Sequence, residues 1–382
     1  MPYWRLSSFY FFYFASLGAL VPYWGLYLKS TGFSAHDIGI FMATIMGTKI
    51  VSPNIWGWIA DHLGHRMLIV RLGCLLAAVT FSGVFVSNNY WWLLAVMVAF
   101  SFFWNAALPQ FEATTFNYLG NYTHRYSSIR LWGSIGFIIA VAGIGSVLDL
   151  QGAGILPFVL IALFAGIWLT SLLVSEQAAH HLPVEHVKLS KLLKNPQVLA
   201  LLVVCFLMQL SHGPYYTFYT IYLEEHRYSS WLIGQLWSLG VIAEVALFLL
   251  MPMLVPRLGL RRLLMLSLLL AALRWLMIGF YVDTLWVLIV AQLFHAASFG
   301  IYHASAIELI HRYFTGPHQG KGQALYSSLS FGAGGAVGSL YSGLMWDTAG
   351  STAAFLVASS VALLALLISW VWIFPEVRVK RI

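Results

Sequence analysis

Six ionisable side chains lie inside long apolar stretches of this sequence. They are Lys49, Glu112, Arg130, Glu244, Arg274 and His295. An ionised group in hydrocarbon is costly unless it is paired or hydrated, so each of these residues is a candidate for ligand binding or proton transfer. Structural ion pairs and polar networks between helices are the alternative for all six.

Glu112 and Arg130 form the first candidate pair. Glu112 lies in the apolar segment before a short polar stretch, and Arg130 begins the segment that follows it. Antiparallel helices joined by a short loop can bring two such side chains together. A carboxylate beside a guanidinium binds hydroxyl groups, and the planar guanidinium fork also binds a substrate carboxylate. The alternative is an ion pair that only fixes the two helices.

Glu244, Arg274 and His295 form the second candidate group, because they lie near the middle of three consecutive apolar segments. A carboxylate and an imidazole that exchange partners with a guanidinium can take up and release a proton. The three residues could therefore form a proton switch in which Arg274 opposes protonation of Glu244 until it swings away. A static polar network joining three helices is the alternative.

Lys49 is the remaining member of the six. Its amine could extend toward the membrane surface, or it could help to attract an anion. The sequence gives equal weight to the two roles.

The elements that must position these residues are membrane helices. The chain of 382 residues is 60% hydrophobic and only 9% charged, with a mean hydropathy of +0.81, whereas soluble domains are about a quarter charged. Its 16 Trp and 19 Tyr suit the interfacial belts of membrane proteins.

Lys and Arg fall at every second junction between apolar segments, so the net charge of +7 indicates membrane topology and predicts no nucleic-acid partner. Cys74 and Cys205 lie in separate apolar runs, and we expect no disulfide and no metal site.

Twelve apolar segments are long enough to cross a bilayer core of about 30 Å. They are residues 4–28, 36–57, 67–87, 91–117, 129–149, 153–175, 196–223, 229–251, 262–282, 285–310, 322–346 and 352–374. A long polar stretch separates the sixth segment from the seventh. We therefore predict an all-α membrane protein with a first bundle at 1–175, a linker at 176–195 and a second bundle at 196–382.

The distribution of positive charge predicts the orientation. Lys and Arg concentrate in one set of alternate loops, while the other set carries only Lys29 and Arg227. The positive-inside rule then places both termini and the linker in the cytoplasm. We expect a bacterial inner membrane, bound lipid and a monomer.

The loop after the second segment contains a polar motif. Gly57, Asp61, Gly64 and Arg66 follow the pattern Gly-x-x-x-Asp-x-x-Gly-basic-basic, and a fainter copy ends at Gly259-Leu-Arg in the second half. This motif resembles the loop between helices 2 and 3 of the major facilitator superfamily. The resemblance implies twelve helices in two pseudo-symmetric six-helix bundles, with a gating role for the motif and a substrate exposed alternately to each side.

Two further strings look like repeats. Tyr126-Ser-Ser opens the fifth segment and Tyr326-Ser-Ser opens the eleventh, and both run on into glycine-rich helices. Close helix packing is the interpretation we prefer for those glycines.

The string Pro109-x-x-Glu112-Ala, followed by Arg130-x-x-Gly, resembles the lactose-type sugar–proton symporters. That resemblance implies that Glu112 and Arg130 contact substrate and that the second candidate group couples a proton. Phe137 stands where those symporters stack a sugar on Trp, which disfavours a sugar. Gln292 and Ser298 stand where they carry a lysine and a second glutamate.

A narrower resemblance is to the phenylpropionate permease branch of the superfamily. It rests on the strings Leu236 to Glu244, Leu273 to Trp275 and Leu293 to His295. It implies proton-coupled uptake of 3-phenylpropionate or a related aromatic acid. Aromatic residues could line the cavity, although packing is the alternative for each: Tyr10, Tyr13, Trp104, Phe137, Tyr215, Tyr216 and Trp237.

We therefore predict a symporter that binds a small molecule and protons, with no enzymatic activity and no cofactor. A sugar or nucleoside symporter of the same fold remains the alternative. A drug–proton antiporter is disfavoured because the glycine-rich stretch of the fifth segment contains no proline. A non-transporting sensor is disfavoured because it would not need to keep buried charges.

Overall fold

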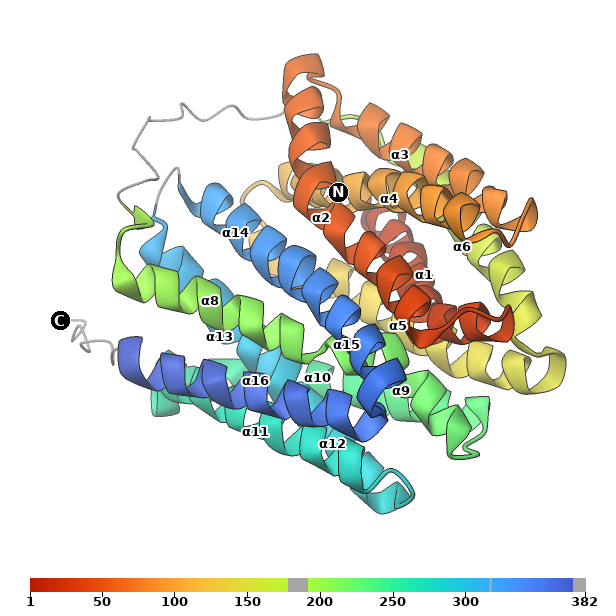
Figure 1. Ribbon diagram of the computed structural model, residues 1–382. Coiled ribbons are helices and arrows are strands. Elements are labelled where there is room, and N and C mark those ends of the chain that lie inside the picture. Colours follow the sequence, from red (N-terminus) through yellow and green to blue (C-terminus); the bar gives the residue numbers. More distant parts are fainter. Residues whose placement is uncertain (178–191, 316–317, 374–382) are drawn as a thin grey trace. The chain divides into compact units, whose positions relative to one another are not determined.

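The computed structural model describes residues 1–177, 192–315 and 318–373, and all regular elements in these ranges are helical (Figure 1). The prediction of an all-α membrane protein is confirmed. The first six predicted segments correspond to α1 (Tyr3–Ser30), α2 (Ala35–Leu63), α3 (Arg66–Phe81) with the 3-10 turn η1 (Ser82–Phe85), α4 (Tyr90–Leu119), η2 (Thr123–Arg125) with α5 (Tyr126–Gln151), and η3 (Ala153–Ile155) with α6 (Leu156–Leu172).

The later segments are more often interrupted than the earlier ones. They correspond to α8 (Pro196–Ser211) with α9 (Gly213–Glu225), α10 (Ser230–Leu258), α11 (Leu260–Phe280), α12 (Leu285–His295) with the π-helix η4 (Ala296–Ile301) and α13 (Tyr302–Tyr313), α14 (Gln319–Ser327) with the π-helix η6 (Ser328–Gly334) and α15 (Gly335–Ala349), and α16 (Ser351–Trp372). π-Helical turns are rare and occur frequently at functional sites.

Eleven helices in the described ranges are long and apolar enough to cross a membrane. The remaining predicted segment, 322–346, lies within the helical run from α14 to α15. The chain is therefore a multi-pass integral membrane protein.

The ends of α2 follow from local sequence chemistry. The Ser34 hydroxyl accepts a hydrogen bond from the Asp37 backbone N–H, and the Asp37 carboxylate accepts one from the Ser34 N–H, which is a capping box. At the other end Gly64 has a φ of 70°, a left-handed conformation that favours glycine. Gly259, in the second copy of the motif, also has a positive φ, of 78°.

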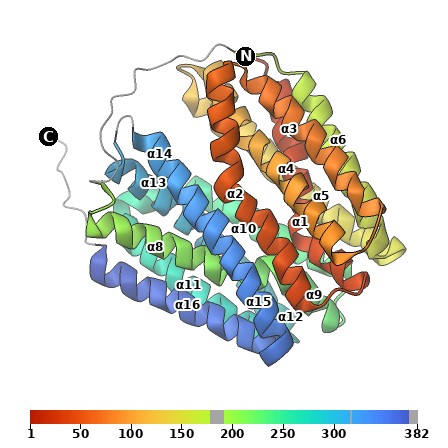
Figure 2. The ribbon, with the colours of Figure 1, turned by 45° about the horizontal axis from the view of Figure 1, so that its top comes forward.

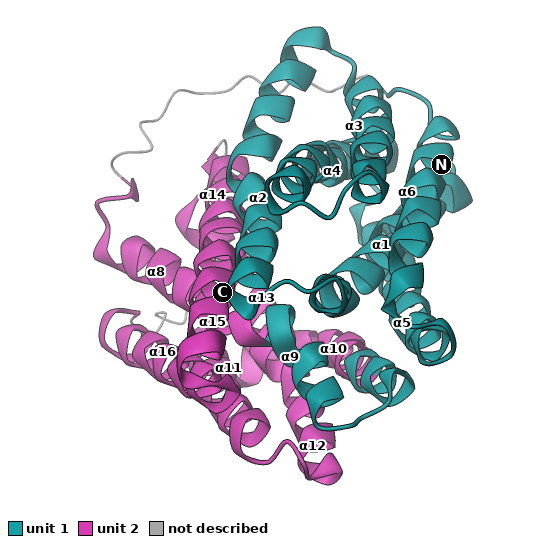
Figure 3. Ribbon diagram, turned by 45° about the vertical axis from the view of Figure 1, so that its right-hand side comes forward, with its two compact units in different colours: residues 1–182, 215–238 teal, residues 183–214, 239–382 magenta. Residues whose placement is uncertain are grey.

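The chain forms two compact units, shown in two colours in Figure 3. The first contains residues 1–182 and 215–238, and the second contains residues 183–214 and 239–382. The boundaries at 1–175, 176–195 and 196–382 that the sequence indicates remain a prediction about the two repeats.

In the first unit, α1 lies alongside α5 and α3 lies alongside α4 (Figures 1 and 2). Residues 215–238 contact these helices on both sides of the loop between α9 and α10. The Lys29 ammonium lies 3.3 Å from Glu224 Oε2 and 3.0 Å from Glu225 Oε1. The Asp149 carboxylate accepts hydrogen bonds from two backbone N–H groups at the start of α10, those of Ser230 and Trp231.

In the second unit, α16 packs against α8 and α11. An apolar cluster of Met251, Leu263, Ala297 and Ile301 joins α10, α11 and the π-helix η4. This packing fixes the π-helical turn that follows His295.

Candidate functional site

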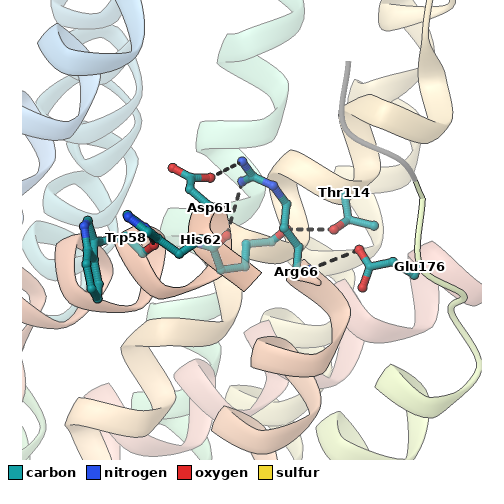
Figure 4. A network of polar contacts seen from close by, with 7 residues as sticks. Trp58, Asp61, His62, Arg66, Thr114 and Glu176 are labelled. Atoms are coloured by element: carbon teal, nitrogen blue, oxygen red, sulfur yellow. Dashed lines mark hydrogen bonds and ion pairs between the residues drawn. The ribbon is translucent and has the colours of Figure 1, made fainter. Parts of the chain in front are cut away.

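The predicted gating motif forms a polar network around Arg66 (Figure 4). Arg66 Nη2 lies 2.7 Å from Asp61 Oδ1, and Arg66 Nη1 donates to Gln110 Oε1 at 3.2 Å. Gly57 faces the same glutamine, because a Cβ atom there would lie 3.4 Å from Gln110 Nε2. The turn after Gly64 thus brings the end of α2 and the start of α3 against α4.

Glu176 completes this network in a way that the sequence does not indicate. Its carboxylate accepts hydrogen bonds from the backbone N–H groups of Arg66 at 3.1 Å and Met67 at 2.9 Å. These groups are among the unsatisfied donors at the start of α3, where a negative charge is favourable. From the sequence alone, Glu176 is only the first residue of the linker.

Glu112 and Arg130, the predicted substrate pair, both lie in the first unit but have different immediate contacts. Glu112 Oε1 accepts a hydrogen bond from the Tyr126 hydroxyl at 3.0 Å. The Arg130 guanidinium lies 3.6 Å from the centroid of the Phe14 ring and 5.8 Å from that of Tyr10. The two charged residues form no direct ion pair within 4.0 Å.

Arg130 therefore has an orientation set by aromatic rings. Within residues 1–177, 192–315 and 318–373, its N–H groups have no hydrogen-bond acceptor and no ion-pair partner. Guanidinium groups stack readily on aromatic faces and still present their in-plane donors. The group is thus held in place with its donors available to a ligand.

Trp104 lies in an aromatic stack close to this pair in the first unit. Its ring stacks on Tyr13 with centroids 5.1 Å apart, and Tyr13 stacks on Phe9 at 6.1 Å. Trp104 is only 2% exposed, and its Nε1 donor has no hydrogen-bond partner among the described residues. Phe137 is half-buried, and its backbone lies against Gly18 of α1.

Tyr215 and Trp237 also lie in the first unit. Their ring centroids are 4.4 Å apart, and Trp237 Nε1 donates to Thr220 Oγ1 at 3.1 Å. Both side chains are buried. They form a second aromatic group, built from α9 and the start of α10.

The predicted proton-coupling residues come together in the second unit. His295 Nε2 lies 3.7 Å from Glu244 Oε2, so a carboxylate and an imidazole share one contact. Arg274 is fully buried and donates from Nε to the Ala291 carbonyl at 2.9 Å. His295 and this carbonyl both belong to α12, which therefore links Arg274 to the histidine.

Two residues that depart from the lactose-type pattern complete the Arg274 site. Arg274 Nη2 donates to Gln292 Oε1 and Nη1 donates to the Ser298 hydroxyl, each at 3.3 Å. Trp275 places its ring 4.7 Å from the same guanidinium, and the His212 ring packs edge-on against Trp275 at 4.8 Å. Arg274 is held by neutral acceptors rather than by a carboxylate in these contacts.

In the described ranges no group of three or more His, Cys, Asp or Glu residues could hold a metal ion. Cys74 and Cys205 are both buried thiols.

Comparison with protein families identifies the fold. The model of the MFS-1-like family matches residues 3–357. The chain belongs to this family. It is therefore a membrane transporter of the major facilitator type and not an enzyme, and the resemblance noted in the sequence is confirmed at the level of the superfamily.

Individual proteins with similar sequences or structures agree with a transporter of this fold. The chain is 30% identical to the "Probable 3-phenylpropionic acid transporter" of Escherichia coli (strain K12), with 94% of each chain covered. It is 25% identical to the "Maltose permease" of Geobacillus stearothermophilus, over 94% of this chain and 92% of that protein. Among solved structures, a mutant of the nucleoside transporter NupG matches with a TM-score of 0.86 and 17% identity, over 97% of this chain and all of the other.

Proposed function

We propose that this MFS-1-like protein is a proton-coupled symporter that imports a small aromatic carboxylate, such as 3-phenylpropionate, by alternating access. The observation that carries the proposal is the Arg130 guanidinium, which stacks on Phe14 at 3.6 Å and has no acceptor among the described residues. A carboxylate offers two parallel acceptors to that fork.

The aromatic surroundings suit the rest of such a substrate. Phe14 and Tyr10 fix the guanidinium plane, and Phe14 packs edge-on against Tyr13, which stacks in turn on the buried Trp104. Aromatic rings pair favourably in offset and edge-to-face arrangements, so a phenyl group gains more here than an aliphatic chain would. The name of the 30% identical relative from Escherichia coli supports the same class of substrate.

Proton coupling is assigned to Glu244 and His295. Their contact of 3.7 Å changes from an attraction to a neutral contact, or the reverse, when a proton arrives or leaves. Arg274 supplies a positive charge beside them, with its guanidinium hydrogen-bonded to Gln292 and Ser298, and its swing away from Glu244 stays a prediction. A charge change at this group is a means of altering the helix packing of the second unit.

The loop between α9 and α10, with its ion pairs and hydrogen bonds, fits the extracellular side. With both termini in the cytoplasm, the loop after α1 and the loop after α9 face outward. The pairs of Lys29 with Glu224 and Glu225 then lie on that side. We place the protein in a bacterial inner membrane as a monomer.

A sugar or nucleoside symporter is the second candidate, because similar proteins include some named as a maltose permease and as nucleoside transporters. The chain is also 23% identical to the "Putative nucleoside transporter YegT" of Escherichia coli (strain K12), over 75% of this chain and 70% of that protein. The Glu112 carboxylate and the Arg130 guanidinium could together bind ribose or sugar hydroxyls. Phe137 in place of Trp disfavours the sugar.

The test is uptake into proteoliposomes loaded with purified protein under an inward proton gradient. We expect labelled 3-phenylpropionate to accumulate, with maltose and uridine failing to compete. Arg130→Gln should abolish this accumulation while the protein remains folded, and Arg125→Gln, an exposed arginine five residues earlier, should leave it unchanged. Accumulation of uridine or maltose instead of the acid would overturn the substrate assignment, and undiminished uptake by R130Q would overturn the role of Arg130.

A further inference from the structure

The charges deep inside the membrane spans do not balance. Five Asp, Glu, Lys or Arg residues lie six or more residues from both ends of their spans in the described ranges: Lys49, Glu112, Arg130, Glu244 and Arg274. Six residues of α-helix correspond to about 9 Å. These five residues include three cations and two carboxylates, which leaves one positive charge in excess.

Lys49 is the cation that cannot escape to the membrane surface. It is the midpoint of α2, fourteen residues from Ala35 and fourteen from Leu63. At 1.5 Å per residue this is about 21 Å from either end, which is far beyond the reach of a four-carbon side chain. Lysines extend to the interface only near helix ends.

The polar neighbours of Lys49 on α2 all have partners. Thr48 Oγ1 accepts from Asn105 Nδ2 at 2.9 Å, and the Ser52 hydroxyl donates to the Phe102 carbonyl. These contacts pack α2 against α4. They involve Thr48 and Ser52, and the Lys49 amine takes no part in either hydrogen bond.

The Lys49 amine itself has a weak contact only. Within the described ranges its hydrogen-bond partner is the sulfur of Met46, at 3.5 Å and in the same helix, and no carboxylate oxygen lies within 4.0 Å. A thioether is a poor acceptor. A half-buried ammonium at mid-membrane with this environment costs stability.

We infer that Lys49 supplies the positive charge that balances the carboxylate of the transported substrate. Before the coupled proton is taken up, binding of one monovalent acid brings these buried charges to three of each sign, whereas a neutral sugar or nucleoside leaves the excess in place. The inference rests on the proposed function for the identity of the ligand, and it adds a second cation to the fork of Arg130. It also gives a reason for selectivity toward acids over their uncharged analogues.

The first experiment compares the affinities of an acid and its amide. Isothermal titration of the purified full-length protein with 3-phenylpropionate and with 3-phenylpropionamide compares two ligands of similar shape, of which only the first is charged. In Lys49→Met we expect the Kd of the acid to rise about tenfold or more, with the Kd of the amide changed less than about twofold. Lys49→Arg should keep the acid affinity within a few-fold of wild type. Lys321→Met, which removes an exposed lysine, controls for the loss of one positive charge. Equal acid affinity in wild type and K49M would overturn the inference.

The second experiment uses no ligand and therefore does not depend on the substrate. Because Met restores an apolar side chain of similar length, K49M should raise the melting temperature of the ligand-free protein by about 2 °C or more. A lower melting temperature would show that the ammonium has a stabilising partner, and it would overturn the inference. If the wild type binds neither the acid nor the amide, the proposed function fails, and this melting temperature still decides whether Lys49 carries an unbalanced charge.

Discussion

The Tyr126 hydroxyl donates a hydrogen bond of 3.0 Å to Glu112 Oε1. Tyr126 begins α5, and Glu112 lies in the preceding helix α4. The second repeat contains a matching contact, in which the hydroxyl of Tyr326 lies 2.9 Å from His303 Nδ1. Tyrosines at the start of the two Tyr-Ser-Ser strings thus each hold an ionisable side chain of the preceding segment. The sequence repeat has a counterpart in polar contacts within each unit.

Removing this hydroxyl should weaken substrate binding without unfolding the protein. In Tyr126→Phe the Glu112 carboxylate loses the partner that fixes its orientation, and a lost hydrogen bond to a charged group costs about 1.5–3 kcal/mol. We expect a rise of about tenfold in the KM for uptake. Tyr122→Phe, at an exposed tyrosine in the same loop, should have no effect. An unchanged KM in Y126F would show that Glu112 does not act in binding.

Loss of the titratable group at Glu244 should separate transport from the proton gradient. Glu244→Gln keeps the size of the side chain but cannot take up or release a proton. We expect gradient-driven accumulation to fall about tenfold or more, while exchange of external for internal substrate continues. His124→Gln, at an exposed histidine, serves as the control. If E244Q and His295→Gln both accumulate substrate normally, the proton is carried elsewhere.

Glu176 should stabilise the first unit by capping α3. Its carboxylate accepts hydrogen bonds from the N–H groups of Arg66 and Met67, so Glu176→Gln should lower the free energy of unfolding by about 1 kcal/mol. Glu308→Gln removes an exposed carboxylate whose partner is Arg312, one turn further along its helix, and should cost about half as much or less. Denaturation in detergent solution measures both. If both variants lower the free energy of unfolding equally, Glu176 does not stabilise the first unit as a helix cap.

A side chain at Gly234 should push residues 215–238 away from α5. A Cβ atom there would lie 2.5 Å from the Val141 carbonyl oxygen and 2.8 Å from the Tyr23 hydroxyl, which are backbone and buried atoms that cannot easily move. Gly234→Val should therefore lengthen and broaden the distance between spin labels at Leu150 and Arg227, two residues of the first unit. Gly143→Val is the matched control, since a Cβ there meets nothing within 4 Å. The same distance distribution in both variants would contradict the predicted steric effect.

The positions of most helices along the chain could be predicted from the sequence, because hydropathy and helix capping are local properties. The turn with Gly64 and Arg66 follows from its spacing, and the structure adds the ion pair with Asp61. The sequence predicts one unbroken segment at 196–223, whereas the structure divides it into α8 and α9 at Gly213. The pair Gly213-Pro214 is the local signal for this break.

The partners within the candidate site could not be predicted, because they depend on helix rotation and packing. Phe14 is one of several aromatic residues in the run from Phe9 onward, and only the packing of α1 on α5 selects it to contact Arg130. Gln292 and Ser298 were recognised as departures from a family pattern, but their role as acceptors for Arg274 required the structure. The roles of the site residues in transport remain predictions.

The central claim is that Arg130 receives the carboxylate of an aromatic acid, and a structure with 3-(4-bromophenyl)propionate tests it most directly. Bromine marks the ring, and the density of the acid places its carboxylate. The proposal predicts two hydrogen bonds of about 2.7–2.9 Å from the guanidinium of Arg130 to the carboxylate oxygens, with Phe14 still stacked on the guanidinium. A bound acid whose carboxylate makes no hydrogen bond to Arg130 would contradict the account.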